Sequence, residues 1–236
     1  ILADEVGLGK TIEAGLILKE YMVRGLVNKA LILVPASLVN QWVKELNEKF
    51  YIPAIAFRKN YRWDQYHVIV SSIDTAKRSP HKEEILQIPY DFLLVDEAHK
   101  LKNHRTLNYE FVKSIQKKYC LLLTATPIQN ELIEIFNLVS ILRPGHLGDY
   151  DTFIKRHGKD RKQIKRDAYL KQLIQKVMIR NTRKDTQLND IKRHIDTTWL
   201  EFTEEEKRVY DTIQALDHEF LPTLAKLTYL REFCSS

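Results

Sequence analysis

The sequence predicts an α/β fold, in which a mostly parallel sheet is covered by helices on both faces. Through the first ~145 residues, short apolar runs alternate with amphipathic helical segments. The apolar runs are continuous, as is typical of strands that are buried on both faces. Each run stops at small or polar residues, and in open α/β sheets ligands bind at the carboxyl ends of the strands.

Four apolar runs are expected to form strands that end at one edge of this sheet. Pro35 stops the first run, Ser71-Ser72 and Asp96-Glu97 follow the next two, and Thr124 follows the fourth. All candidate chemistry therefore falls at this edge. The four runs are Ala30–Val34, His67–Val70, Phe92–Val95 and Cys120–Leu123.

Amphipathic segments between these runs are expected to be the covering helices. After the first strand, Ser37 can cap a helix in which Trp42 and Leu46 share one face. This spacing makes Trp42 a core residue rather than a base-stacking one. A later helix is expected over Glu131–Leu142, and strand signals fade beyond it. We place a domain boundary near residue 148.

Residues 149–236 are expected to form a mainly helical, basic extension. Between Lys155 and Arg193 there are fourteen Lys or Arg against four Asp and no Glu. A solvated helical face is one interpretation of this run, whereas its local net charge of +10 favours a polyanion partner. Further on, Thr203 and Glu206 form a capping box that opens another helix.

Composition excludes several classes of protein. The 236 residues, 44% hydrophobic and 29% charged, suit an ordinary α/β domain with a small appendage. Cys120 and Cys234 lie far apart and give neither a disulfide framework nor a metal-ligand spacing; Cys120 is expected to be a buried thiol. No apolar stretch approaches the ~20 residues that span a membrane, so no membrane partner is expected.

Gly7-Leu8-Gly9-Lys10-Thr11 has the form of the end of a phosphate-binding loop. Such a loop holds ATP by backbone N–H groups at a helix N-terminus, with the lysine on the β- and γ-phosphates and the threonine hydroxyl on Mg²⁺. Side chains in place of the glycines would block the phosphates or the positive-φ turn. The strict pattern fails at Asp4, where it requires glycine. A strand should precede the loop, so we expect the natural protein to continue upstream of Ile1.

An acidic pair, Asp96-Glu97, follows the third strand run. In phosphoryl transfer one carboxylate holds Mg²⁺ and another group handles the attacking water. We assign the first role to Asp96 and the second to Glu97, which together with Lys10 are the candidate catalytic residues. An isolated pair of this kind would be interpreted as a helix N-cap. The phosphate loop upstream favours the catalytic interpretation.

Three further residues at these strand ends are candidates for coupling. His99 either connects the nucleotide site to other motifs or satisfies local hydrogen bonds. Thr124 and Thr126 either relay the state of the γ-phosphate or cap the end of the fourth strand. Physical chemistry alone leaves both pairs of alternatives open.

Taken together, the motifs resemble those of the Swi/Snf-type ATPases of helicase superfamily two. In that family aspartate commonly fills the position of Asp4, and the sequence of the first motif favours a bacterial and archaeal branch. The resemblance covers almost the whole chain. Its segments are motif I at Ile1–Thr11, motif Ia at Leu33–Trp42, motif Ib at Ser71–Thr75, a DEAH-type motif II at Asp96–Asn103, motif III at Leu121–Asn130, and the basic segment Met178–Asp185.

The resemblance implies that residues 1–148 are the first of two RecA-like lobes, a three-layer P-loop NTPase fold, and that residues 149–236 lead toward a second lobe. It implies ATP and Mg²⁺ as cofactors, with Asp4 and Leu8 joining the loop residues at the nucleotide and Thr11 and Asp96 at the metal. It also implies double-stranded DNA as a partner, contacted mainly at phosphates. The implied DNA-binding residues are Pro35, Ala36, Ser37, Ser71, Ser72, Lys100, Lys102 and Asn103.

The expected function is therefore that of the N-terminal lobe of an ATP-dependent duplex-DNA translocase. Such an enzyme remodels protein–DNA complexes, such as those of RNA polymerase or a nucleoid protein, in the cytoplasm and nucleoid of a prokaryote or in a eukaryotic nucleus. Two alternatives remain open, a strand-separating DNA or RNA helicase of the same superfamily and a non-catalytic docking lobe. Nothing resembles the second lobe, whose arginines complete the ATP site, so the fragment alone is expected to be almost inactive.

Overall fold

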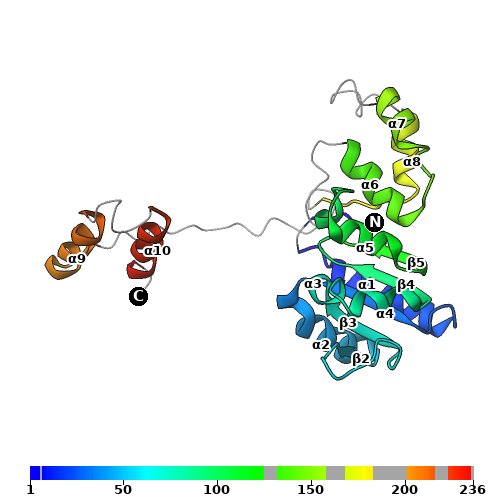
Figure 1. The fold of residues 1–236 in the computed structure, drawn as a ribbon, viewed down its shortest axis with the longest axis horizontal. Coiled ribbons are helices and arrows are strands. Elements are labelled where there is room, and N and C mark those ends of the chain that lie inside the picture. The colour runs from blue at the N-terminus through cyan, green and yellow to red at the C-terminus, as the bar shows by residue number, and fades with distance from the viewer. Residues whose placement is uncertain (6, 125–131, 158–167, 183–200, 216–222, 235–236) are drawn as a thin grey trace. The chain divides into compact units, whose positions relative to one another are not determined.

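The computed structural model describes residues 1–5, 7–124, 132–157, 168–182, 201–215 and 223–234 (Figure 1). Contacts between residues group the chain into two compact units, Ile1–Leu188 and Asn189–Ser236. The first unit holds the sheet and is described first. The expected boundary near residue 148 stays a prediction.

Five parallel strands form the sheet, in the order β2-β3-β1-β4-β5. Four of them confirm the strands expected from the apolar runs, whereas β2, with only three residues, was missed. Because all the strands run the same way, their carboxyl ends share one edge of the sheet. The strands are β1 (Ala30–Val34), β2 (Ala54–Ala56), β3 (Val68–Ser72), β4 (Tyr90–Val95) and β5 (Lys117–Leu122).

Helices cover both faces of the sheet, which confirms the predicted three-layer α/β fold (Figure 1). Successive residues of β1 point to opposite faces: Leu31 packs with one set of helices and Ile32 with the other. The Ile32 face is covered by α1 (Lys10–Val23) and α2 (Val39–Phe50). The Leu31 face is covered by α3 (Ile73–Ala76), α4 (His81–Gln87), α5 (Leu107–Ser114) and α6 (Leu132–Leu142).

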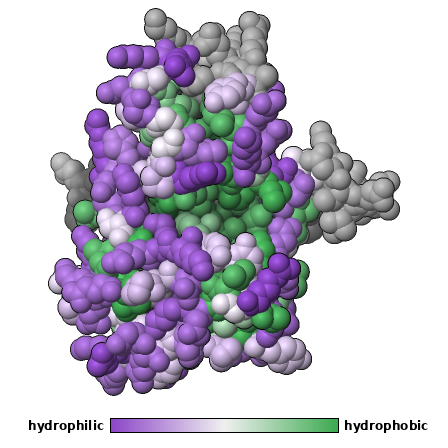
Figure 2. Space-filling view, turned by 90° about the vertical axis from the view of Figure 1, so that its right-hand side faces the viewer, coloured by the Kyte–Doolittle hydropathy of each residue, from purple (hydrophilic) through white to green (hydrophobic). Residues whose placement is uncertain are grey.

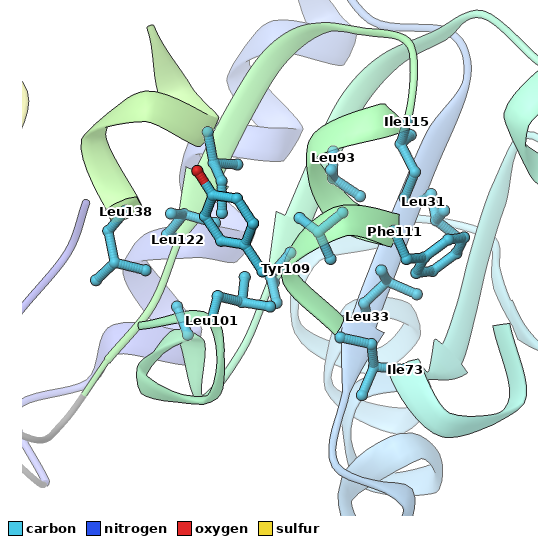
Figure 3. Packing of buried hydrophobic residues seen from close by; sticks show 14 of the residues in the cluster. Leu31, Leu33, Ile73, Leu93, Leu101, Tyr109, Phe111, Ile115, Leu122 and Leu138 are labelled. Carbon is cyan, nitrogen blue, oxygen red and sulfur yellow. The ribbon is translucent and has the colours of Figure 1, made fainter. Parts of the chain in front are cut away.

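Figure 3 shows the packing on the Leu31 face. The Phe111 ring of α5 lies over Leu31 and Leu33, and the Tyr109 ring lies near Leu101 and Leu122 (Figure 3). All six residues are at most 3% exposed. Dense packing on both faces therefore holds the carboxyl edge of the sheet, where the candidate site lies, on a rigid base.

The helix after β1 is confirmed, but its predicted cap is wrong. Ser37 lies inside a short 3₁₀ turn, η1 (Ala36–Leu38), and Leu38 is the residue that precedes α2. No side chain caps the N-terminal end of η1 or that of α2. The 3₁₀ turn inserts one tight turn before the α-helix and leaves Ser37 exposed on the surface.

At the other end of the sheet, Lys117 opens β5 and also caps the end of α5. Its Nζ donates to the carbonyls of Val112, Lys113 and Ile115 at 3.1, 3.2 and 3.1 Å, and burial lowers its pKa. A cation at a helix C-terminus interacts favourably with the carbonyls left unpaired there. The cap therefore ties α5 to the adjoining strand.

Replacing Lys117 with Met is expected to lower the free energy of unfolding by about 1–2 kcal/mol, because the three carbonyls lose a charged donor. Urea denaturation at an unchanged m-value measures this loss. The neighbouring Lys118 is exposed, so Lys118→Met is the matched control and should stay within about 0.5 kcal/mol of the wild type. Equal losses in the two variants would contradict the capping role.

The first unit continues with α7 (Tyr150–His157), which ends in the basic stretch of the sequence, and α8 (Ala168–Gln175), which lies within it. The second unit contains α9 (Glu204–Ala215) and α10 (Thr223–Phe233). The predicted capping box is confirmed, since Thr203 Oγ1 accepts from Glu206 N–H at 3.3 Å and Glu206 Oε2 accepts from Thr203 N–H at 2.7 Å.

The surface is a mixture of hydrophilic and hydrophobic residues. Figure 2 shows one face on which hydrophilic residues surround a central hydrophobic band. Among the described helices, none is long and apolar enough to cross a membrane. Cys120 is half-buried against the core, and burial raises the pKa of its thiol to about 11.

Candidate functional site

The phosphate loop leads directly into α1. Gly7 and Gly9 have φ values of 85° and 91°, and Gly9 immediately precedes the helix. These left-handed conformations explain why glycine stands at both positions. Among the residues that the structure describes, a Cβ placed on Gly9 would meet no atom within 4 Å, so the space beside Gly9 at the start of α1 is open. This is the geometry that backbone N–H groups need to approach a phosphate.

Lys10 folds back onto its own loop. Its Nζ donates to the carbonyl of Asp4 at 2.7 Å and to that of Glu5 at 3.2 Å. Thr11 follows in the first turn of α1 and is half-buried. A phosphate at the loop can replace the two carbonyls as the partner of the lysine, because a phosphate oxygen accepts a stronger, charge-assisted hydrogen bond.

Asp4, the residue that departs from the strict glycine pattern, is 1% exposed. Its Oδ1 accepts from the backbone N–H of Asn181 at 2.6 Å, and both of its oxygens lie 3.2 Å from Asn181 Nδ2. Asp4 also faces Glu13 of α1: burial, and then the charge and hydrogen bond of Asp4, raise the pKa of the Glu13 carboxyl. The carboxylate thus joins the phosphate loop to a segment that lies far away in the sequence.

That segment runs beside the start of the chain. Ala3 N–H donates to the carbonyl of Ile179 at 2.8 Å, and Glu5 N–H donates to the carbonyl of Asn181 at 3.1 Å. Leu2 forms parallel bridges to Leu123 on one side and to Ile179 on the other. Residues 1–5 therefore lie between the end of β5 and the basic segment.

Asp96 follows β4 directly, and both of its carboxylate oxygens have donors. Oδ1 accepts from the backbone N–H of Glu97 at 2.8 Å, and Oδ2 accepts from the indole Nε1–H of Trp42 at 3.0 Å. Burial raises the pKa of the carboxyl, while the Trp42 bond and the Lys10 charge act in the opposite direction. The carboxylate is therefore held by its own loop on one oxygen and by α2 on the other.

Glu97 has a left-handed backbone, with φ 53°, which is uncommon for a residue other than glycine. Neighbouring bonds hold it there: Asp96 Oδ1 accepts its N–H, and the next residue, Ala98, donates to the carbonyl of Leu123 at 2.8 Å. Glu97 Oε2 lies 3.0 Å from His99 Nδ1, but without the alignment of a hydrogen bond. Such conformations cluster at functional sites.

Thr124 lies beside the segment that leads into the phosphate loop. It is 1% exposed, and its N–H donates to the carbonyl of Leu2 at 3.0 Å. The preceding residue, Leu123, donates to the carbonyl of Val95, just before Asp96, at 2.9 Å. The second predicted coupling threonine, Thr126, lies outside the described residues.

The predicted DNA-binding residues differ in exposure. Ala36, Ser37, Lys100, Lys102 and Asn103 are exposed. Lys102 Nζ also lies 2.8 Å from Glu134 Oε1 of α6. Pro35 and Lys100 line one small hollow together with Asp96 and Glu97, so this part of the predicted DNA track adjoins the predicted metal site.

Ser71 and Ser72, by contrast, are only 3% and 7% exposed. The hydroxyl of Ser72 accepts from Thr75 N–H at 3.0 Å and so caps α3. That of Ser71 donates to the carbonyl of Ser72 at 3.3 Å. Both side chains therefore face local partners.

The arrangement fits a magnesium–nucleotide complex. The open turn at Gly9 faces the helix N-terminus, and the hydroxyl and carboxylate oxygens of Thr11 and Asp96 are the hard donors that Mg²⁺ prefers. No cluster of three or more His, Cys, Asp or Glu side chains among the described residues forms a ready-made metal cage. Mg²⁺ does not require such a cage, because it usually takes one or two protein ligands, with phosphate and water as the others.

Sequence reasoning missed the site roles of two residues. Trp42 was placed in the core, and it is 2% exposed, but its N–H also reaches the predicted metal ligand. This role could have been anticipated, because the N–H of a buried indole usually takes a hydrogen-bond partner. Asn181 bonds Asp4 across 177 residues, and no local pattern reports such a pairing.

Comparisons with known proteins agree with this geometry. The family model of the SNF2-related domain matches residues 1–231. The chain is 59% identical over its whole length to a Bacillus subtilis (strain 168) protein named as an uncharacterized ATP-dependent helicase, YqhH, and covers 43% of it. It is 35% identical, over 70% of its length, to the RNA polymerase-associated protein RapA of Actinobacillus pleuropneumoniae serotype 3, of which it covers 19%.

Among solved structures, the SWI2/SNF2 ATPase core of Sulfolobus solfataricus in complex with dsDNA matches with a TM-score of 0.70. The match covers 98% of this chain and 53% of that one, at 24% identity, and confirms the RecA-like fold. The chain thus spans about half or less of the length of these proteins. The family model, in contrast, matches nearly the whole chain. The chain therefore belongs to the SNF2-related family, as its motifs indicated.

Proposed function

We propose that this chain is the first ATPase lobe of a double-stranded DNA translocase that remodels protein–DNA complexes. The observation that carries the proposal is the backbone pairing that brings the two motifs together: Leu2, upstream of the phosphate loop, pairs with Leu123, whose N–H donates to the carbonyl of Val95, just before Asp96, at 2.9 Å. Family membership supports ATP-driven work on DNA. The name of the RapA relative makes an RNA polymerase complex the first candidate target, with a nucleoid protein as the next.

Each residue at the loop has a defined task in this proposal. Lys10 leaves the carbonyls of Asp4 and Glu5 and binds the β- and γ-phosphates. Thr11 and Asp96 hold Mg²⁺, directly or through water, and the bound ion supplies neutralisation of the charge on the phosphates. Glu97 orients the attacking water. Asp4 holds the loop in place through Asn181.

Coupling to DNA follows from neighbouring surfaces. Pro35 and Lys100 lie next to the acidic motif, in one hollow with it. The exposed residues Ala36 and Ser37 follow Pro35 in the chain, and the exposed Lys102 and Asn103 follow Lys100. Their amides, hydroxyls and ammonium groups suit phosphates and do not read bases, as a motor that moves along any sequence requires. Ser71 and Ser72, whose side chains are buried, are proposed to contribute through the shape of the β3–α3 turn. His99 and Thr124 connect the two surfaces.

The activity resides in the complete two-lobe protein. An arginine finger is worth about 10³–10⁵ in rate in related phosphoryl-transfer systems, and the second lobe would supply such arginines. This lobe alone is therefore proposed to bind ATP weakly and to hydrolyse it very slowly. The basic extension, with its local charge of +10, is proposed to add affinity for a polyanion.

Duplex DNA is expected to raise the ATPase rate of the full-length protein, since the proposed DNA surface adjoins the metal site. Steady-state phosphate release with duplex DNA, single-stranded DNA and single-stranded RNA measures the effect. Lys10→Ala is the control for contaminating ATPases. Activation by single-stranded RNA alone, or strand separation coupled to turnover, would replace the translocase by a strand-separating helicase. The absence of turnover and ATP binding in the full-length protein would favour a docking lobe.

A further inference from the structure

Trp42 joins two parts of the lobe that have separate tasks in the proposed function. Its ring is 2% exposed and packs on the same face of α2 as Leu46 and Phe50. Hydrophobic packing explains why the ring is buried. It does not supply the hydrogen-bond acceptor that the N–H of a buried indole needs. That partner is Asp96 Oδ2, 3.0 Å away, on a carboxylate assigned to Mg²⁺.

The bond restricts how the Asp96 carboxylate can turn. One oxygen is held by the backbone N–H of Glu97 at 2.8 Å and the other by Trp42 at 3.0 Å. The first donor belongs to the same loop and moves with it, whereas the second comes from α2. Of these two bonds, only the Trp42 bond ties the carboxylate to a different element. Partners of this kind orient metal ligands and tune the affinity for the metal.

The helix that carries Trp42 begins at the proposed DNA surface. α2 starts at Val39, immediately after the η1 turn that contains the exposed Ala36 and Ser37. Trp42 is three residues into the helix, about 4.5 Å along its axis at 1.5 Å per residue. The η1 turn joins α2 without an intervening loop, so we expect a shift of the turn to move the start of α2 and, with it, the indole that bonds Asp96.

We propose that Trp42 is a positioning residue that orients the Asp96 carboxylate for Mg²⁺ and transmits DNA contact at residues 36–38 to the metal site. The inference rests on the proposed function, because it requires both a metal at Asp96 and DNA at the η1 turn. It adds a physical route by which bound DNA regulates the rate of ATP hydrolysis. In this role Trp42 acts through the Asp96 carboxylate.

The test is Trp42→Phe in the full-length protein, since phenylalanine keeps an aromatic ring in the core and removes the N–H. Trp63→Phe is the matched control. Trp63 is 1% exposed, stacks on Phe57 and donates its Nε1–H to His81 Nδ1 at 3.3 Å. Each variant loses one indole hydrogen bond and similar volume, so their effects on unfolding should be comparable.

Two readouts separate positioning from stability. The first is equilibrium binding of a fluorescent ATP analogue over a Mg²⁺ titration, in which Trp42→Phe should raise the Mg²⁺ concentration required by about 10- to 100-fold. The second is the ratio of ATPase rates with and without duplex DNA. This ratio should fall in Trp42→Phe while the Kd for DNA is retained. Trp63→Phe should leave both readouts at wild-type values.

Wild-type Mg²⁺ dependence and wild-type DNA stimulation in Trp42→Phe would overturn the inference. Equal changes in the two variants would also overturn it, because they would reveal only the cost of a looser core. These results differ from a failure of the proposed function, in which the wild-type protein itself would show no stimulation by duplex DNA.

Discussion

Replacing Glu97 with Gln is expected to reduce the ATPase rate of the full-length protein by about 10²–10⁴-fold while leaving ATP affinity nearly unchanged. That range is typical for removal of a group that handles a proton in the transition state. Glutamine has the same shape but cannot accept the proton from water. Single-turnover hydrolysis gives the rate, and equilibrium binding of labelled ATP gives the affinity.

The substitution changes the chemistry of the side chain without adding backbone strain. Glu97 holds φ at 53°, and glutamine meets the same left-handed penalty, so folding should be unaffected. Glu134, which pairs with Lys102 at 2.8 Å, provides a control carboxylate: Glu134→Gln should leave the chemical rate unchanged. Wild-type turnover in Glu97→Gln would remove this residue from its assigned role and would direct attention to Asp96 and His99.

The fold could be predicted from the sequence because its strands are buried on both faces. A continuous apolar run such as Leu31–Val34 carries that information in every residue, and the structure buries all four of its residues. β2 lacked such a run, since Ala54–Ala56 is short and has two half-buried residues. Ser37 was misassigned as a cap because the 3₁₀ turn Ala36–Leu38 precedes the α-helix and moves the helix start to Val39.

The site was partly predictable for a different reason. Gly9, Lys10 and Asp96 stand in local motifs whose spacing follows from the chemistry of phosphate and Mg²⁺. The bonds that support these residues are not local. Trp42 lies 54 residues from Asp96, and Asn181 lies 177 residues from Asp4. Patterns along the chain report elements and motifs, whereas such supporting contacts depend on the assembled fold.

The second large effect is expected at Asp4. Replacing it with Ala should lower the free energy of unfolding by about 2–4 kcal/mol, because the N–H and Nδ2 donors of Asn181 lose a buried charged acceptor. Relief of the repulsion with Glu13 offsets only part of this loss, and the pKa of the Glu13 carboxyl should fall toward its ordinary value. Urea denaturation measures the stability.

ATP affinity should fall together with stability in Asp4→Ala, since the freed segment no longer holds the phosphate loop. Asp91 supplies the matched control: its Oδ2 accepts from the N–H groups of Asn28 and Lys29 at 2.8 and 2.9 Å, so Asp91→Ala should lose stability but keep ATP affinity. Asn181→Ala should have a smaller effect than Asp4→Ala, because its backbone N–H still reaches the carboxylate. Unchanged ATP affinity in a folded Asp4→Ala variant would show that Asp4 anchors the basic segment without shaping the phosphate loop.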